Sequence, residues 1–290
     1  MKFFKYFPKK NGPRQKDVLR ERFKNFVLEL RVRNFSNQTI DAYLHYNGKF
    51  LDFIKKEQRS INSKDIKAYL NYLVLNGAGP RTVNMAINSL KCYYGSYLGK
   101  RLFTNIKRSK IPKDFDPVIS KEQVKLMIEN TKFLKHRLLI ELLYSSGMRV
   151  GECVKVRVDD VDYNDRIVFI KKGKGAKDRF TIISNRFIKD LKKYLNSREK
   201  QSVYLFDNGF DHISIRTAEE VVKLAAKRAG IKKRVYPHLL RACFATHLLG
   251  NKVPMEKIQK LMGHSDIKTT QGYARLNTEE FKKIKSPLDV

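Results

Sequence analysis

A stretch without any regular hydrophobic period divides this chain. Residues 99–117, GKRLFTNIKRSKIPKDFDP, are basic and contain two prolines, whereas helical spacing of apolar residues precedes and follows them. Proline fixes its own φ and lacks a backbone N–H, so the stretch is unsuited to a continuous helix. We interpret it as an interdomain linker, the alternative being a surface loop within one domain. A length of 290 residues suffices for two domains, which we place at residues 14–98 and 118–290.

The segment before the linker carries apolar residues at helical spacing in four blocks. The first block predicts one helix over residues 16–33. Ser36 and Ser63 are expected N-caps of the second and third helices, and Pro80 suits the first turn of the fourth. The residues expected to face inward include Val18, Leu19, Phe23, Phe26, Val27 and Leu30 in the first helix and Ile66, Tyr69, Leu70, Leu73 and Val74 in the third. Four helices with short connections predict a small bundle.

The segment after the linker mixes helical blocks with two short β-branched runs. Ser120 and Gln123 form a capping-box pattern at its first helix, and a second apolar helix stops at SSGMR. The runs RIVFI and RFTII flank a lysine-rich, glycine-containing turn, which predicts a β-hairpin with a basic tip. Further helices are expected over residues 187–195, 217–229, 239–249 and 255–262, the last ended by Gly263. The predicted fold class is mainly α with a small antiparallel β-sheet.

The charge balance indicates the kind of partner. The chain has 61 Lys and Arg against 29 Asp and Glu, a net charge of +32. The excess covers the whole chain, with 24 basic and 7 acidic residues in residues 1–110 and 37 and 22 in the remainder. Such an excess favours a polyanion, because each neutralised phosphate releases condensed counterions. We expect nucleic acid; an anionic membrane, an RNA-only role and a merely solvated lysine-rich surface are the alternatives.

Other sequence features narrow the class of protein. No apolar run reaches the ~18 residues of a membrane span, and the start of the chain lacks the pattern of a signal peptide. The three cysteines are far apart in apolar or helical contexts, which predicts reduced core thiols in a cytoplasmic protein. No Cys/His cluster has metal-ligand spacing and no P-loop pattern is present, so we expect neither a metal nor a nucleotide cofactor.

Four basic loci fall at boundaries between predicted elements, where a site can form. They contain Arg149, Lys174, the pair His238 and Arg241, and His264, and Tyr273 follows nine positions later. Two arginines can make forked bonds to the oxygens of one phosphate and stabilise a pentacoordinate transition state. Lysine and histidine can bond the same oxygens or move protons. A tyrosine, whose free pKa is about 10, becomes a credible nucleophile in such cationic surroundings.

Each of these residues also has a structural interpretation. The arginines could be salt-bridge partners, the lysine a solvated turn residue or a plain phosphate contact, the histidines cap or turn residues, and the tyrosine a core aromatic. The combination in order, however, resembles a known signature. The blocks SGMRVGE, GKGAKDR, HLLRACFATHLL and LMGHSDIKTTQGYARL are similar to those of the tyrosine recombinases, the phage-integrase and Xer group. The resemblance covers most of residues 118–280, and the bundle before it resembles the family's core-binding domain.

The resemblance implies a role for each residue of the signature. Arg149 and Arg241 would clamp the scissile phosphate, Lys174 would protonate the leaving 5′ oxygen, His238 and His264 would bond phosphate oxygens and assist proton transfer, and Tyr273 would attack phosphorus to give a 3′-phosphotyrosine. Glu152 would support Arg149 by analogy. One departure is Ala242, where the family often has histidine, which puts fine tuning in doubt but not activity.

The implied function is a site-specific DNA recombinase that needs no metal or ATP and resolves chromosome or plasmid dimers. It would act in the cytoplasm at the nucleoid, as a tetramer on two double-stranded DNA sites. The residues after Tyr273, with Leu276, Phe281 and Ile284, would dock on a neighbouring subunit or pack on their own domain. A mobile-element integrase, a type IB topoisomerase-like enzyme and a non-enzymatic architectural DNA-binding protein are the other functions considered.

Overall fold

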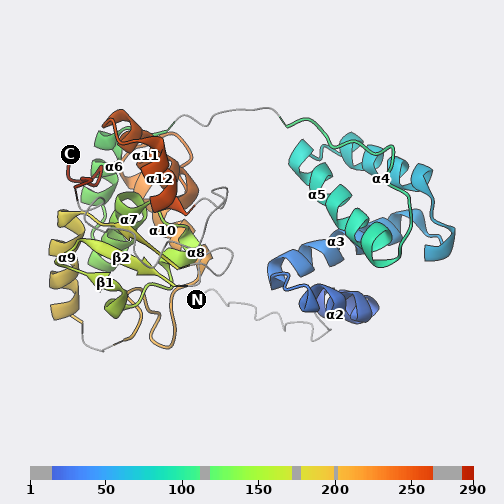
Figure 1. The fold of residues 1–290 in the computed structure, drawn as a ribbon, viewed down its shortest axis with the longest axis horizontal. Helices are drawn as coiled ribbons and strands as arrows, with labels where there is room; N and C mark the ends of the chain where they lie inside the picture. Colours follow the sequence, from blue (N-terminus) through green and yellow to red (C-terminus); the bar gives the residue numbers. More distant parts are fainter. Residues whose placement is uncertain (1–14, 112–117, 172–177, 199–201, 264–282) are drawn as a thin grey trace, which may run out of the picture. The chain divides into compact units, whose positions relative to one another are not determined.

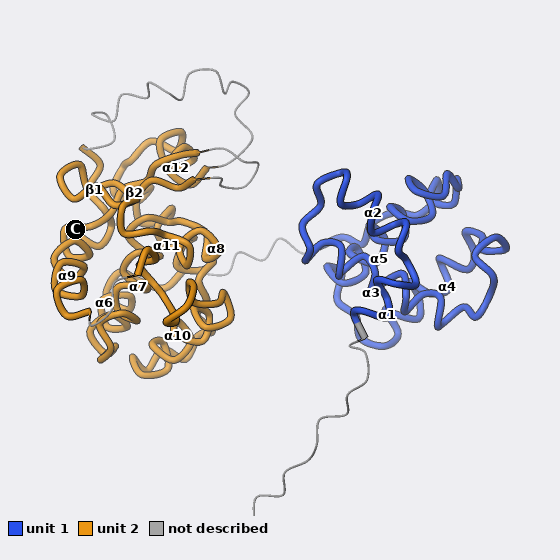
Figure 2. The backbone as a smooth tube through the Cα atoms, turned by 90° about the horizontal axis from the view of Figure 1, so that it is seen from below, with its two compact units in different colours: residues 1–114 blue, residues 115–290 orange. Residues whose placement is uncertain are grey.

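The computed structural model describes residues 15–111, 118–171, 178–198, 202–263 and 283–290. The chain divides into two compact units, residues 1–114 and 115–290, each with its own hydrophobic core (Figure 2). The boundary falls within the segment that the sequence marks as a linker. Among the described residues, none of the helices combines the length and the apolar character needed to span a membrane.

Unit 1 is a helical bundle. It contains α1 (Gln15–Arg22), α2 (Lys24–Val32), α3 (Asn37–Ile54), α4 (Ser63–Leu75) and α5 (Pro80–Leu90), with a 3-10 turn at Gln58–Ser60 and a π-helix at Lys91–Tyr97 after α5. The prediction of one helix over residues 16–33 is wrong, because the backbone leaves the helical region at Phe23, with φ −116° and ψ 30°. The buried Phe23 ring packs edge-on against Tyr93, with 5.2 Å between centroids. The helix is therefore interrupted where the Phe23 ring packs against Tyr93, and the spacing of apolar residues in the sequence does not reveal this interruption.

The helix starts of unit 1 test the capping predictions. Ser36 caps α3 as expected, its hydroxyl accepting from the Thr39 backbone N–H at 3.2 Å. The expected Ser63 cap is wrong, because Asn62 is the N-cap of α4 and forms a capping box with Asp65. The Asn62 side chain accepts hydrogen bonds from two backbone N–H groups of the first turn, those of Lys64 and Asp65. Two residues expected inside are also exposed, Val18 at 51% and Val74 at 53%.

Part of the expected linker belongs to unit 1. Asn84 exchanges two hydrogen bonds with the backbone of Ser109, at 2.8 and 2.9 Å. Apolar side chains of the same stretch pack on the core of unit 1, namely Leu102, Phe103 and Ile106. Residues 99–111 are therefore tied to the bundle, and residues 112–117 lie outside the described residues.

Unit 2 combines helices with a small sheet (Figure 1). Its elements are α6 (Lys121–Glu129), α7 (Leu134–Ser146), α8 (Val150–Cys153), a 3-10 turn (Val158–Asp160), β1 (Val161–Asp162), β2 (Ile167–Ile170), β3 (Arg179–Ile182), α9 (Asn185–Asn196), α10 (Ile215–Arg228), α11 (Pro237–Gly250) and α12 (Met255–Met262). The sheet is antiparallel in the order β1-β2-β3, with Val168 opposite Thr181. The hairpin and the helical blocks predicted from the sequence are confirmed, as is the fold class. The predicted basic tip of the hairpin, residues 172–177, lies outside the described residues.

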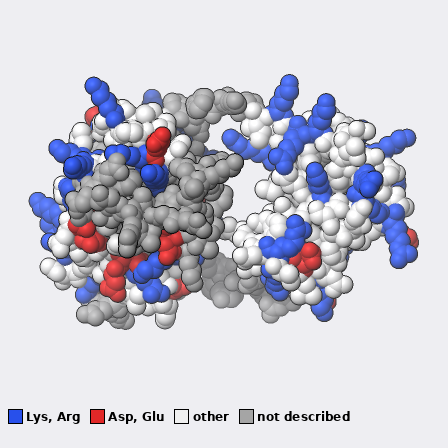
Figure 3. All heavy atoms as spheres, viewed as in Figure 1, with Lys and Arg blue, Asp and Glu red and all other residues white. Residues whose placement is uncertain are grey.

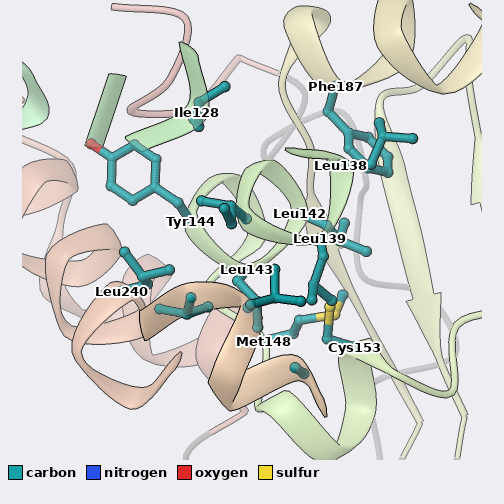
Figure 4. Close-up of a cluster of buried hydrophobic side chains, with 14 of the residues drawn as sticks. Ile128, Leu138, Leu139, Leu142, Leu143, Tyr144, Met148, Cys153, Phe187 and Leu240 are labelled. Carbon is teal, nitrogen blue, oxygen red and sulfur yellow. The ribbon is translucent and has the colours of Figure 1, made fainter. Parts of the chain in front are cut away.

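Helix α7 is the centre of unit 2. The last nine of its 13 residues, 138–146, are all buried, and the apolar ones pack with side chains from the surrounding helices (Figure 4). The helix ends at Gly147 in the left-handed conformation, with φ +59°. A Cβ on Gly147 would lie 2.2 Å from the Phe244 ring of α11, so glycine is required both by conformation and by space. This fixed end of α7 is where the candidate site begins.

The C-terminal residues pack on their own unit. Ser286 Oγ donates to the Ser145 carbonyl at 3.2 Å, and the Asp289 carboxylate accepts from the Asn185 backbone N–H at the start of α9. Leu288 is buried in the main core, and Ile284 packs on the smaller core beside α12. For these residues the interpretation of packing on the chain's own domain holds. Leu276 and Phe281 lie outside the described residues.

Glu141 on α7 is a buried carboxyl that couples the stability of unit 2 to pH. It is fully buried, and only its Oε1 is paired, accepting from Arg186 Nε at 3.1 Å. Burial, followed by the charge of Asp190, raises the pKa of Glu141 from 4.5 to about 7. Because the folded-state pKa is the higher one, the stabilising contribution of Glu141 is full below about pH 4.5 and is lost as the pH rises through 7.

Replacing Glu141 with Gln removes this titration. Between pH 5 and pH 8 we expect the free energy of unfolding of the wild type to fall relative to that of the variant by on the order of 2 kcal/mol. Urea denaturation of both proteins at the two pH values, followed by circular dichroism, measures the difference. If the difference in unfolding free energy between wild type and variant is the same at both pH values, Glu141 does not titrate in this range.

Candidate active site

Arg241 of α11 lies at the meeting point of two helix ends. Its side chain is buried, and the residue is only 3% exposed. Nη1 donates to the Gly147 carbonyl at 2.5 Å, and Nη2 donates to the Met262 carbonyl at 2.7 Å. These carbonyls belong to the C-terminal ends of α7 and α12, where backbone acceptors lack helical partners and the helix dipole is negative. The ends of two helices therefore stabilise one buried guanidinium.

Burial, and then the nearby charge of Arg149, lowers the pKa of Arg241 to about 10. The group therefore stays protonated at neutral pH. Of its five N–H donors, two are used by the Gly147 and Met262 carbonyls. The other three N–H donors of Arg241 are not used by these carbonyls, and a guanidinium binds an anion with such donors.

Arg149 approaches the same helix end from the start of α8. It is the N-cap residue, and its backbone N–H donates to Glu152 Oε2 at 2.8 Å. Nη1 donates to Glu152 Oε1 at 3.1 Å, and Nη2 donates to the Gly263 carbonyl at 3.3 Å. The side chain is 29% exposed, so solvent or a ligand can reach it. Glu152 holds both the backbone and the side chain of Arg149, as the analogy in the sequence suggested.

His238 occupies the first turn of α11, three residues before Arg241 and on the same side of the helix. The residue is exposed. Desolvation of the ring by neighbouring protein atoms, followed by the positive charges of Arg241 and Arg149, lowers the pKa of His238 below its usual value. The imidazole is therefore neutral at neutral pH, and a neutral imidazole has one donor and one acceptor nitrogen.

Arg179 is the residue of this site that the sequence reasoning missed. It begins β3, and its Nη1 and Nη2 donate to the two oxygens of Glu152 at 3.0 and 2.6 Å. Burial opposes ionisation of Glu152, but the hydrogen bonds and charge of Arg179, with those of Arg149, hold the pKa of Glu152 below its usual value. Its sequence signal is its place as the last residue of the block GKGAKDR, which also contains Lys174.

Three residues of the predicted signature lie outside the described residues, namely Lys174, His264 and Tyr273. Lys174 falls between β2 and β3 in the sequence, and His264 directly follows Gly263. The structure thus brings together Arg149, His238 and Arg241, and the chain continues from this point into the segment of His264 and Tyr273.

Several other predictions concern groups near the site. His247, interpreted as structural, pairs its Nδ1 with the Tyr144 hydroxyl at 2.7 Å. The three cysteines are free and buried, as predicted. Within the described ranges, no group of three or more His, Cys, Asp or Glu side chains is placed to hold a metal ion. On the face seen in Figure 3, lysine and arginine side chains lie over both units, and several acidic side chains lie among them on unit 2.

A basic helical unit, followed by a unit in which two arginines and a histidine converge at helix ends, defines an enzyme suited to phosphodiesters. The chain belongs to the phage integrase family. Residues 117–280 match that family, and residues 22–103 match the N-terminal SAM-like domain of phage integrases. The resemblance found in the four sequence blocks is therefore confirmed.

Individual relatives agree with this assignment. The chain is 32% identical over 271 residues to the tyrosine recombinase XerA of Pyrococcus horikoshii, covering 92% of each chain. It is 31% identical to a XerA recombinase of known crystal structure, with a TM-score of 0.50 and coverage of 89% of this chain and 94% of that one. The XerH recombinase bound to its difH substrate shares the fold at 21% identity, with a TM-score of 0.65 and coverage of 86% and 79%.

Proposed function

We propose that this protein is a site-specific DNA recombinase that cuts and rejoins strands through a 3′-phosphotyrosine. The observation that carries the proposal is the placement of Arg149 and Arg241 on carbonyls at the end of α12, directly before the segment of His264 and Tyr273. Arg149 and Arg241 therefore present their remaining donors beside Gly263, and His264 is the next residue in the sequence. The net charge of +32 supports double-stranded DNA as the partner, and the related XerH was solved with its DNA substrate.

The chemistry follows from the charge that develops at phosphorus. Tyr273 Oη attacks, an Oη–P bond forms, the P–O5′ bond breaks, and the pentacoordinate transition state carries additional negative charge on its oxygens. Arg149 and Arg241 stabilise that charge with donors fixed in advance, and such preorganised stabilisation is usually the largest single contribution to catalysis. His238 and His264 bind oxygens or accept the phenol proton, and Lys174 donates a proton to O5′. Attack by a free 5′-hydroxyl on the tyrosine ester reverses these steps and rejoins the strand.

The biological task that we propose is dimer resolution of the Xer type, performed at the nucleoid by a tetramer on two DNA duplexes. The similarity to XerA over 92% of each chain supports this choice over that of a mobile-element integrase. A topoisomerase-like enzyme would use the same tyrosine chemistry on one duplex. A plasmid with two copies of the target site separates these functions, because a recombinase exchanges the sites and a topoisomerase only relaxes the plasmid.

Capture of the covalent adduct on genomic DNA of the host tests the proposal. Protein-linked fragments are recovered under denaturing conditions and the DNA ends are sequenced. We expect one shared sequence at the attached 3′ ends. Ends scattered over unrelated sequences would contradict site specificity, and the absence of any linked DNA would contradict a phosphotyrosine intermediate.

Lys174→Ala tests the proposed general acid. We expect cleavage of a substrate with an ordinary 5′ oxygen to slow by roughly 10²- to 10⁴-fold, the usual contribution of a positioned proton donor. A substrate with sulfur at the bridging 5′ position should restore the rate, because a thiolate leaves without a proton. Adduct formation is measured on nicked substrates that carry the captured site, with Lys171→Ala as a nearby lysine control. Absence of rescue would remove Lys174 as the acid.

A further inference from the structure

The end of α12 is held by three arginines on three successive carbonyls. Arg179 Nε lies 3.4 Å from the Leu261 carbonyl, Arg241 Nη2 lies 2.7 Å from that of Met262, and Arg149 Nη2 lies 3.3 Å from that of Gly263. These acceptors are the ones that a helix leaves without internal partners. His264 is the next residue, so the three arginines together fix the point from which the chain leaves α12.

Arg179 differs from the other two in what its terminal nitrogens do. Nη1 and Nη2 both face Glu152, at 3.0 and 2.6 Å, and the side chain is 11% exposed, against 29% for Arg149. Its guanidinium also packs closely on Gly263, where an added Cβ would lie 2.8 Å from Nε and 3.0 Å from Cζ. A side chain enclosed in this way is placed to hold other groups, not to bind the phosphate.

Glu152 links Arg179 to the phosphate-binding arginine. Its Oε1 accepts from Nη1 of both arginines, at 3.1 Å from Arg149 and 3.0 Å from Arg179. Its Oε2 accepts from the Arg149 backbone N–H at 2.8 Å as well as from Arg179 Nη2. Displacing Arg179 therefore leaves Glu152 with two of its four hydrogen bonds, both of them from Arg149.

We propose that Arg179 is a positioning residue that fixes Arg149, through Glu152, in a set relation to the end of α12, the point from which the chain continues to His264. This inference rests on the proposed recombinase function. Arg179 acts on the rate of the chemical step, because a displacement of about 1 Å between phosphate and nucleophile can lower a rate by about 10²-fold. It leaves DNA binding unchanged, because binding depends on the many other basic residues of the chain.

The test compares Arg179→Gln with Arg198→Gln in the full-length protein. Arg198 is a matched control in the same unit, because its Nη2 also donates to a carboxylate at 2.6 Å, that of Asp207, and its side chain is 8% exposed. On nicked substrates with the captured site, we expect Arg179→Gln to form the adduct about 10²-fold more slowly than the wild type. Arg198→Gln should stay within about threefold, and both should bind DNA within about twofold of the wild type.

Two further measurements separate positioning from a merely structural role. The double variant Arg179→Gln/Glu152→Gln should be no slower than the slower single variant, because residues that act through one another are not additive. The 5′-thiolate substrate should restore Lys174→Ala but not Arg179→Gln. If the rate reduction of the double variant equals the product of the two single reductions, the proposal is overturned. Rescue of Arg179→Gln by the 5′-thiolate substrate would overturn it as well.

Arg179→Lys keeps the test decisive if the glutamine variant does not fold. Lysine retains the charge, but its single ammonium cannot bridge both Glu152 oxygens in the manner of a planar fork. We expect a melting temperature near that of the wild type and a roughly tenfold slower adduct formation. If the wild type forms the adduct and Arg179→Gln or Arg179→Lys forms it at the same rate, the proposed role of Arg179 is overturned. The recombinase function is not overturned by that result. Failure of wild type and Arg198→Gln alike to form an adduct overturns the recombinase function itself.

Discussion

Replacing Tyr273 with Phe is expected to abolish the covalent protein–DNA adduct and leave DNA binding intact. The phenol oxygen forms the bond to phosphorus, and removal of a nucleophile that acts as part of a catalytic unit typically lowers the rate by 10⁴-fold or more, as a rough guide. DNA binding relies on the basic surface of a chain with net charge +32, which this substitution does not alter.

The measurement uses a nicked substrate that traps the cleaved state, resolved on a denaturing gel, with binding followed separately by mobility shift. Tyr163→Phe is a suitable control, because Tyr163 is a partly buried tyrosine of the same unit that packs at the edge of the main core. It should form the adduct at the wild-type rate. An adduct that persists in Tyr273→Phe would assign the nucleophile to another residue.

Arg241→Gln is expected to have the second largest effect, on both catalysis and stability. Glutamine removes the positive charge and is too short to replace a fork that reaches the Gly147 and Met262 carbonyls together. Loss of one fixed donor to a developing oxyanion lowers a rate by roughly 10²- to 10³-fold. Two helix-end carbonyls also lose their buried partner, which costs about 1–3 kcal/mol.

Single-turnover adduct formation, measured well below the melting temperature, separates these two effects of Arg241→Gln. Arg186→Gln is the control, since it removes a bond to the buried Glu141 and leaves the site untouched. It should lower the free energy of unfolding without slowing adduct formation. Wild-type cleavage by Arg241→Gln would show that the buried guanidinium only supports the fold.

The sequence predicted most of the elements because their signals are local. Ser36 caps α3, Ser120 and Gln123 form the capping box of α6, and Gly263 ends α12. In each case the side chain or the missing Cβ acts on the backbone within a few residues. The errors arise where distant packing decides, as at Phe23, whose break in the helix faces a ring from the π-helix seventy residues away in sequence.

The candidate site shows the same division. Arg149, Arg241 and His238 could be selected from their sequence blocks and the order of those blocks, which requires no knowledge of contacts. Arg179 could not be selected in this way. An arginine next to a lysine-rich turn is an ordinary surface residue unless a carboxylate from another element binds it. Its partner Glu152 stands 27 positions earlier in the chain.

The sequence by itself determined the two helical units, the hairpin, the basic character and the identity of the family, since these depend on periodicity, caps, composition and ordered motifs. Only the tertiary structure decided that Arg149, Arg179 and Arg241 hold the last two carbonyls of α12 and that of its C-cap, Gly263. Those contacts join residues between 21 and 114 positions apart, and a hydrogen bond over such separations exists only once α7, α8, β3 and α11 have packed around one helix end.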